Sequence, residues 1–361
     1  MLIQLAITGM LVAMLPLAII LTSKDTDKYR KLVWVTLFLT FDLIMFGSFT
    51  RLTDSGLGCP DWPGCYAQAN PLQAHADIKA AETLMPSGPV TVAKAWIEMI
   101  HRYIAMAVGL LIIAIMLVAW RRWLKSGRKL ISFSPALPTA LFLLVCLQGA
   151  FGAWTVTMKL QPIIVTIHLL LGLVLLGLLT ILGLRHTVQQ SIAVAARALF
   201  IPAVIALVLL VVQIVLGGWV STNYAVLACT DFPLCHGMVI PTMDFGHGFT
   251  LWRELGKTSS GDMLPVEALT AIHWVHRNFA FVVIAYIAWL THKAMKIEGL
   301  RKTAKWILIA IGLQFASGVS TIYLSWPIAI AILHNGGAAL LVLLLVVLIY
   351  KARLAYLNKQ N

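Results

Sequence analysis

Nine long apolar runs dominate this sequence and limit the chain to a fold that spans a membrane. A helix needs about 17 to 25 apolar residues to cross the hydrocarbon core. Runs of that length lie at about 3–22, 33–50, 93–118, 137–157, 162–184, 198–221, 268–290, 305–324 and 328–350. Each is longer and more continuous than the ~10 alternating residues of a barrel strand, so helices must satisfy the backbone. The sequence predicts an all-α integral membrane protein in a lipid bilayer.

The composition excludes the soluble classes of protein. Only 11% of the 361 residues are charged and 60% are hydrophobic, whereas an ordinary soluble domain carries roughly 25% charged residues. This excludes a soluble globular protein, a disordered chain and a nucleic-acid binder. The net charge of +13 does not indicate an acidic partner, because most Lys and Arg residues lie in short loops between apolar runs.

The distribution of Lys and Arg predicts the orientation of the helices, since cytoplasmic loops carry the excess. Of 27 such residues, 19 lie in the segments 24–31, 119–136, 185–197, 292–305 and the C-terminal tail. The tail is therefore expected in the cytoplasm, and two long loops at about 51–92 and 222–267 face outward. The first run precedes a basic cluster, the reverse of a signal peptide. We read it as a retained span with its N-terminus outside.

An internal repeat relates the two halves of the chain. The outward loops carry matching motifs, CPDWPGC at 59–65 and CTDFPLC at 229–235. Further matches in the same order are Gly47-Ser48 with Gly217-Gly218, His101-Arg102 with His276-Arg277, and Gln148 and His168 with Gln314 and His334. Each half holds four apolar runs, an even number, so the copies share one orientation. We predict two parallel four-helix repeats, residues 31–190 and 191–361, with residues 1–30 as an extra span and cytoplasmic loop.

The cysteines of the outward loops form two pairs, each six residues apart. An outer compartment is oxidising, so these pairs predict the disulfides Cys59–Cys65 and Cys229–Cys235. A redox role for the first pair is the alternative to a structural one. Cys146, inside an apolar run, is expected to stay unpaired.

Four of the ten histidines lie about two turns inside the outward ends of apolar runs. They are His101, His168, His276 and His334. Ionisable residues inside the bilayer are costly and usually mark function. A single one could be a histidine hydrogen-bonded between helices, but a repeated set of four is less easily explained in that way. Two imidazoles from facing helices suit axial ligation of a haem iron, whereas zinc needs more protein ligands. We predict one haem site between His101 and His168 and another between His276 and His334.

Charged and polar neighbours of these histidines are further candidates. A buried guanidinium needs an anionic partner, and a haem propionate would provide one for Arg102 and for Arg277. An ion pair with Glu98, four residues earlier, is the alternative for Arg102. Glu98 lies one turn before His101 and is predicted to act as acid, base or charge stabiliser. His273 takes the same place in the second repeat and is predicted as a polar or propionate contact.

These residues together resemble the haem A synthase family. The matching segments are RLTDSGLGCPDWPGC at 51–65, EMIHR at 98–102, His168, His276-Arg277 and His334, within a similarity that covers about residues 33–350. The resemblance implies a membrane oxidoreductase that oxidises the C8 methyl of haem O to a formyl group through hydroxylated intermediates, giving haem A for terminal oxidases. It also implies haem b as a cofactor, with the haem O substrate in the other half. Haem O synthase and oxidase assembly factors are the partners it suggests.

Only the first repeat has a carboxylate beside its ligand, so we expect the substrate haem there, with Glu98, His101 and His168 as catalytic residues. Haem b is then expected between His276 and His334. We expect a bacterial cytoplasmic (inner) membrane protein with both haem sites on the periplasmic side. A di-haem electron carrier resembling cytochrome b561 is one alternative, but its haems should lie on opposite sides. A haem transporter is another, but it needs neither a disulfide-bearing loop nor Glu98. An assembly scaffold is a third, but nothing in it requires four buried histidines.

Overall fold

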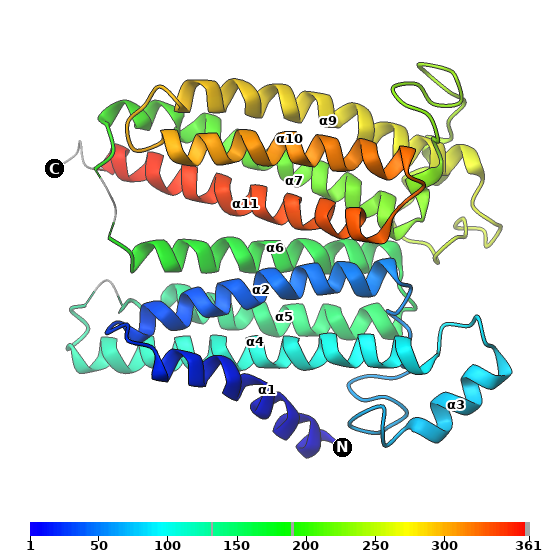
Figure 1. Ribbon diagram of the computed structural model, residues 1–361, viewed down its shortest axis with the longest axis horizontal. Coiled ribbons are helices and arrows are strands. Elements are labelled where there is room, and N and C mark those ends of the chain that lie inside the picture. The colour runs from blue at the N-terminus through cyan, green and yellow to red at the C-terminus, as the bar shows by residue number, and fades with distance from the viewer. Residues whose placement is uncertain (131–132, 189–190, 358–361) are drawn as a thin grey trace. The chain divides into compact units, whose positions relative to one another are not determined.

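The computed structural model describes residues 1–130, 133–188 and 191–357. Residue 190, where the first repeat is predicted to end, and Lys359 of the basic tail lie outside the described residues. Within the described ranges the chain is helical and forms no strand, which confirms the all-α prediction (Figure 1). Nine helices there are long and apolar enough to cross a membrane. They are α1 (Leu2–Thr22), α2 (Lys28–Leu52), α4 (Val92–Lys125), α5 (Ala136–Thr157), α6 (Pro162–Arg185), α7 (Phe200–Thr222), α9 (Val266–Ala294), α10 (Arg301–Tyr323) and α11 (Ile328–Leu357).

Local sequence signals account for several helix starts and for the hydroxyl groups inside the helices. Asp27 caps α2 by accepting a hydrogen bond from the backbone of Arg30, and Thr91 caps α4 in the same way. The first residue of α6 is Pro162, which has no N–H to leave unsatisfied. Buried threonines such as Thr36 return their hydroxyl hydrogen bond to their own helix. These hydroxyl groups are thus accommodated in apolar surroundings without partners from other helices.

The chain divides into two compact units. The first contains Met1–Leu160 and Leu171–Thr187, and the second contains Gln161–Leu170 and Val188–Asn361, so α6 contributes to both. In the first unit α4 is the central helix, because α1, α2 and α5 all pack against it. A short helix, α3 (His75–Leu84), lies in the loop between α2 and α4 and also contacts α4 (Figure 1).

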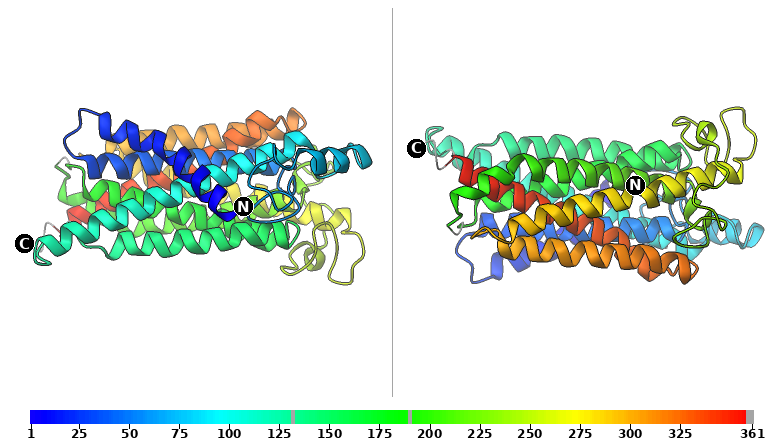
Figure 2. Two further views of the ribbon diagram at one scale, coloured as in Figure 1. Left: turned by 90° about the horizontal axis from the view of Figure 1, so that it is seen from below. Right: turned by 90° about the horizontal axis from the view of Figure 1, so that it is seen from above.

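The second unit is built on a ring of four helices. Helices α7 and α10 each pack against both α9 and α11, so α9 and α11 occupy opposite corners of the ring (Figure 2). The short helices η2 (Val194–Leu199), η3 (Ala225–Leu227) and α8 (Phe245–Gly248) flank the ring. The indole of Trp219 donates to the carbonyl of Gly248 over 2.9 Å. This contact fixes part of the long loop between α7 and α9 to the end of α7.

Candidate active site

Both predicted disulfides are present. Cys59 bonds to Cys65 and Cys229 to Cys235, with a Cα–Cα distance of 4.9 Å in each pair. The second cysteine of each loop also exchanges two backbone hydrogen bonds with the residue three positions later. Among the described residues Cys146 is the free cysteine, and it is exposed on α5. The two loops therefore share one covalent and hydrogen-bonded framework.

The aspartate of each loop motif stabilises the turn that follows the second cysteine. Asp231 accepts hydrogen bonds from the backbone N–H groups of His236 and Gly237, at 2.8 and 2.9 Å. These N–H groups, that of Gly237 above all, lower the pKa of Asp231. Asp61 accepts two equivalent bonds from the residues after Cys65. The aspartate is therefore in the motif for a structural reason, because two successive N–H groups converge on its carboxylate.

The arginine after each repeat-matched histidine holds the adjacent loop. Its guanidinium donates to three carbonyl oxygens of the loop, with N···O distances of 2.8, 2.9 and 3.3 Å for Arg277. The acceptors are Asp61, Pro63 and Gly64 for Arg102, and Asp231, Pro233 and Leu234 for Arg277. The sequence predicted only a propionate or Glu98 as partners. The structure shows that each arginine also fastens a disulfide loop to its helix.

Glu98 and His273 occupy equivalent positions and hold the first cysteine of each loop. Both are buried, each with 4% of its surface exposed. Glu98 Oε2 accepts from the N–H of Cys59 over 2.8 Å, and His273 Nδ1 accepts from the N–H of Cys229 over 3.2 Å. Glu98 Oε1 also forms an ion pair with Arg102. The predicted Glu98–Arg102 pair is therefore present, and it joins the loop to α4 one turn before His101.

A glycine on a neighbouring helix lies against the imidazole at three of the four candidate ligands. A Cβ atom on Gly217 would lie 2.9 Å from Cε1 of His276, and one on Gly318 would lie 3.1 Å from Cε1 of His334. Gly47 stands in the same relation to His101, also at 2.9 Å. Any larger residue would push the ring away, so these glycines let each imidazole lie against a helix backbone. All four histidines are half-buried.

In the second repeat the two candidate ligands lie on opposite corners of the helix ring. His276 lies on α9 and His334 on α11. The Gln213 side chain on α7 lies 3.1 Å from Nδ1 of His276 and donates to the His276 carbonyl. The Ser317 hydroxyl on α10 lies 2.9 Å from Nδ1 of His334. Sequence reasoning missed Gln213 and Ser317, since neither belongs to a motif.

The two candidate ligands of the first repeat belong to different compact units. His101 belongs to the first unit and His168 to the second. The ring of Phe46 stacks on that of His101 with centroids 6.2 Å apart. The pairing of His101 with His168 stays a prediction.

One nitrogen of Arg277 provides a test of whether the second repeat fits a haem. Among the residues that the structure describes, Nη1 of Arg277 is buried and has no hydrogen-bond partner, whereas Nη2 binds the loop. In Arg102 both terminal nitrogens have partners, the loop carbonyls and Glu98. A buried guanidinium nitrogen without an acceptor fits an anionic group such as a propionate. The residues of this repeat therefore fit a haem.

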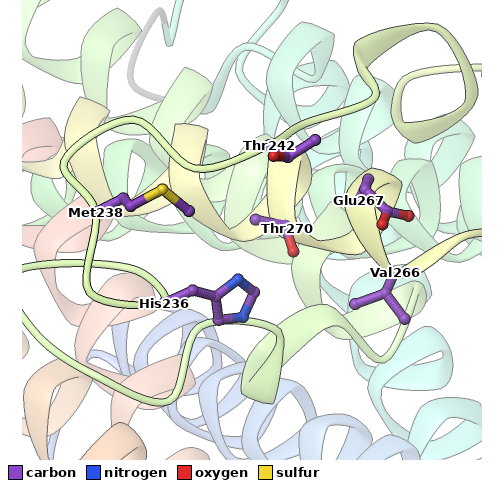
Figure 3. Close-up of a pocket in the computed structure, with 6 residues that line it drawn as sticks. All are labelled: His236, Met238, Thr242, Val266, Glu267 and Thr270. Atoms are coloured by element: carbon purple, nitrogen blue, oxygen red, sulfur yellow. The ribbon is translucent and has the colours of Figure 1, made fainter.

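The remaining histidines lie away from these sites. Exposed ones are His75, His236, His247 and His292. His236 lines a pocket between the second disulfide loop and the start of α9, together with Met238, Thr242, Val266, Glu267 and Thr270 (Figure 3). The ring of His186, just after the end of α6, packs against Tyr29 and Phe133.

Mass mapping under non-reducing conditions is expected to find Cys59 linked to Cys65 and Cys229 linked to Cys235. Alkylation of protein in intact membranes should label Cys146 alone, because that thiol is free and exposed. Labelling of Cys229 or Cys235 to the same extent as Cys146 would contradict the framework described above.

The fold and these loops define a class of multi-pass helical membrane protein whose two halves carry matching disulfide loops, arginines and histidines. The chain belongs to the cytochrome oxidase assembly protein family (COX15-CtaA), which matches residues 30–346. The match begins after α1, so this first helix lies outside it.

Individual relatives agree with the family. The chain is 38% identical over 326 residues to the heme A synthase of Shewanella oneidensis, covering 89% of this chain and 96% of the relative. It is 29% identical over 342 residues to that of Erythrobacter litoralis, covering 86% and 93%. To that of Alkalihalophilus pseudofirmus it is 25% identical over 304 residues, covering 81% and 86%.

Proposed function

We propose that this haem A synthase divides its reaction between its two repeats, with the substrate haem in the first and a permanent haem b in the second. Family membership makes the chain a membrane oxidoreductase that converts haem O to haem A. The relatives named above are haem A synthases rather than electron carriers or transporters. This division is supported by one difference between the repeats. Glu98 in the first repeat and His273 in the second occupy equivalent positions, and only Glu98 is a carboxylate.

The second repeat has the groups that a permanent haem requires. His276 and His334 would hold the haem iron, and Nη1 of Arg277 would donate to a propionate. Nδ1 of His273 accepts from Cys229, which leaves its Nε2–H as a second donor. A haem held by two histidines supplies one-electron redox chemistry when bound. None of these side chains is a carboxylate that could take a proton from a methyl group.

The first repeat has the groups that an oxidation at carbon requires. His101 and His168 are assigned as ligands of the substrate haem. Glu98 lies one turn before His101, and its carboxylate is paired with Arg102 and hydrogen-bonded by the N–H of Cys59. A carboxylate fixed in this way can stabilise positive charge that develops at the C8 methyl or accept its proton. Arg102 positions this carboxylate and is also the candidate propionate contact of this repeat.

Contacts around the second disulfide loop differ from those around the first. The Tyr323 hydroxyl on α10 donates to the carbonyl of Phe232 over 2.9 Å, and the rings of Phe232, Phe281 and Phe315 form a triangle with centroids 6.2 to 6.3 Å apart. The repeat offsets place smaller side chains at three of the four matching positions of the first repeat, namely Trp62, Met106, Gly149 and Thr157. A Cβ on Gly149 would meet no atom within 4 Å. The second loop is therefore tied to α10 by Tyr323, whereas the first loop is tied to α4 by Tyr103, whose hydroxyl donates to the carbonyl of Ala69 over 2.8 Å.

The Lys and Arg distribution supports an inner-membrane protein with both disulfide loops in the periplasm, where oxidising conditions preserve the bonds. The partners that we propose are haem O synthase, which would deliver a farnesylated haem, and oxidase assembly factors, which would receive haem A.

The test of reaction and substrate site together is expression in a host that makes haem O but no haem A. Extraction and chromatography of haems are expected to show hydroxymethyl or formyl haem with the unaltered protein and neither product with His101→Ala or His168→Ala. His236→Ala, in an exposed loop position, is the control and should form product normally. Wild-type amounts of product from both ligand variants would contradict the placement of the substrate haem in the first repeat.

A further inference from the structure

Three neighbouring residues of α10 converge on His334. Gln314 Nε2 donates to the His334 carbonyl over 2.9 Å, and the Ser317 hydroxyl lies 2.9 Å from Nδ1 of the ring. Next to Ser317, Gly318 leaves the space that Cε1 of His334 occupies. The backbone, one face and one nitrogen of this histidine are thus all held by a single helix.

The hydrogen bonding of Ser317 favours the tautomer of His334 that carries its proton on Nδ1. The hydroxyl has one proton, and it donates this to the Gln314 carbonyl over 3.0 Å. With its proton on that carbonyl the hydroxyl offers oxygen lone pairs to the imidazole, which suits a ring whose Nδ1 carries the proton and donates it to Ser317. The lone pair of the neutral ring is left on Nε2. A histidine binds a metal through such a lone pair, and a hydrogen bond at the other nitrogen orients the ring and makes it a stronger ligand.

We propose that Ser317 is a positioning residue that presents Nε2 of His334 to the haem iron and strengthens the iron–imidazole bond. This inference rests on the proposed function, in which His334 is an axial ligand of haem b. A more basic imidazole favours ferric over ferrous iron, so Ser317 lowers the reduction potential of this haem.

The residues of the first repeat that match Ser317 and Gln213 are hydrocarbons. The offset of 166 residues that relates His168 to His334 relates Phe151 to Ser317, and the offset of 170 relates Leu43 to Gln213. The phenyl ring of Phe151 cannot accept a hydrogen bond from an imidazole as the Ser317 hydroxyl can, whereas the Gln213 group beside His276 is an amide nitrogen, a donor. Duplication was therefore followed by divergence beside the ligands. The repeat assigned to the permanent haem has a hydroxyl beside the ring of His334, and outer contacts of this kind strengthen metal binding about 10- to 100-fold.

The test compares purified wild-type protein with Ser317→Ala, Ser317→Thr and Ser320→Ala, by haem b retention and by redox titration of the low-spin haem. Ser317→Ala should bind haem b about 10- to 100-fold more weakly and titrate at a more positive potential. Ser317→Thr keeps a hydroxyl that can bond the same carbonyl and should restore both values. Ser320→Ala is the matched control one turn along α10, since its hydroxyl bonds only to its own helix, and it should behave as wild type.

An unchanged potential and unchanged haem retention in Ser317→Ala would overturn the inference. Should that variant fail to accumulate, Ser317→Cys keeps the volume with a weak acceptor. Ser317→Cys should also make the reduction potential of the haem more positive. An unchanged potential in this variant would contradict the inference as well. His334→Ala separates this failure from failure of the proposed function. Loss of low-spin haem b in His334→Ala with no effect of Ser317→Ala refutes only the role of Ser317, whereas full retention in His334→Ala refutes the haem site itself.

Discussion

Replacement of Glu98 by glutamine is expected to lower haem A formation about 10²- to 10⁴-fold, the usual contribution of a positioned acid or base, while the protein stays folded and keeps haem b. The amide can still accept from the N–H of Cys59, and Arg102 keeps its three loop carbonyls. What is lost is the negative charge one turn from His101. Chromatography of extracted haems measures the effect and would reveal an accumulated hydroxylated intermediate.

The matched control for Glu98→Gln is His273→Gln in the second repeat. It also leaves an acceptor for the cysteine N–H, here that of Cys229, but it removes no carboxylate. It should therefore leave product formation within a few-fold of wild type when normalised to haem b content. A Glu98→Gln variant with normal turnover would reduce Glu98 to a structural partner of Arg102 and Cys59.

Replacement of His276 or His334 by alanine is expected to abolish the low-spin haem b spectrum of the purified protein. Either change removes one of two axial ligands, and the ring neighbours Gln213 and Ser317 cannot replace an imidazole. Optical and electron paramagnetic resonance spectra of freshly purified protein measure the loss. His247→Ala, at an exposed loop position, should leave both spectra unchanged. Full low-spin spectra in both ligand variants would show that the second haem site is assigned wrongly.

The helices and the disulfides were predictable because their signals are local. Apolar length alone gives nine spans, and the outer position of Cys59, Cys65, Cys229 and Cys235 gives the two bonds that the structure contains. The repeat also indicated that Gly47-Ser48 and Gly217-Gly218 matter. Their contact with His101 and His276 emerges only when α2 lies on α4 and α7 on α9.

The partners of the charged and ring atoms were not predictable. The carbonyl acceptors of Arg102 and Arg277 depend on the path of a turn, and no side-chain pattern in CPDWPGC records that path. Ser317 looks like any helix serine until α10 brings it against His334, 17 residues later in the sequence. The first repeat has Phe151 at the position that matches Ser317, and this difference has a structural meaning only once the contact of Ser317 with His334 is known.

The most direct test of the division of labour is haem b content, measured side by side in purified His101→Ala and His276→Ala from a host that makes haem O. The account predicts that His101→Ala keeps haem b at the wild-type ratio to protein and forms no haem A, whereas His276→Ala loses haem b. Loss of haem b in His101→Ala, with His276→Ala retaining it, would reverse the assignment of the two repeats.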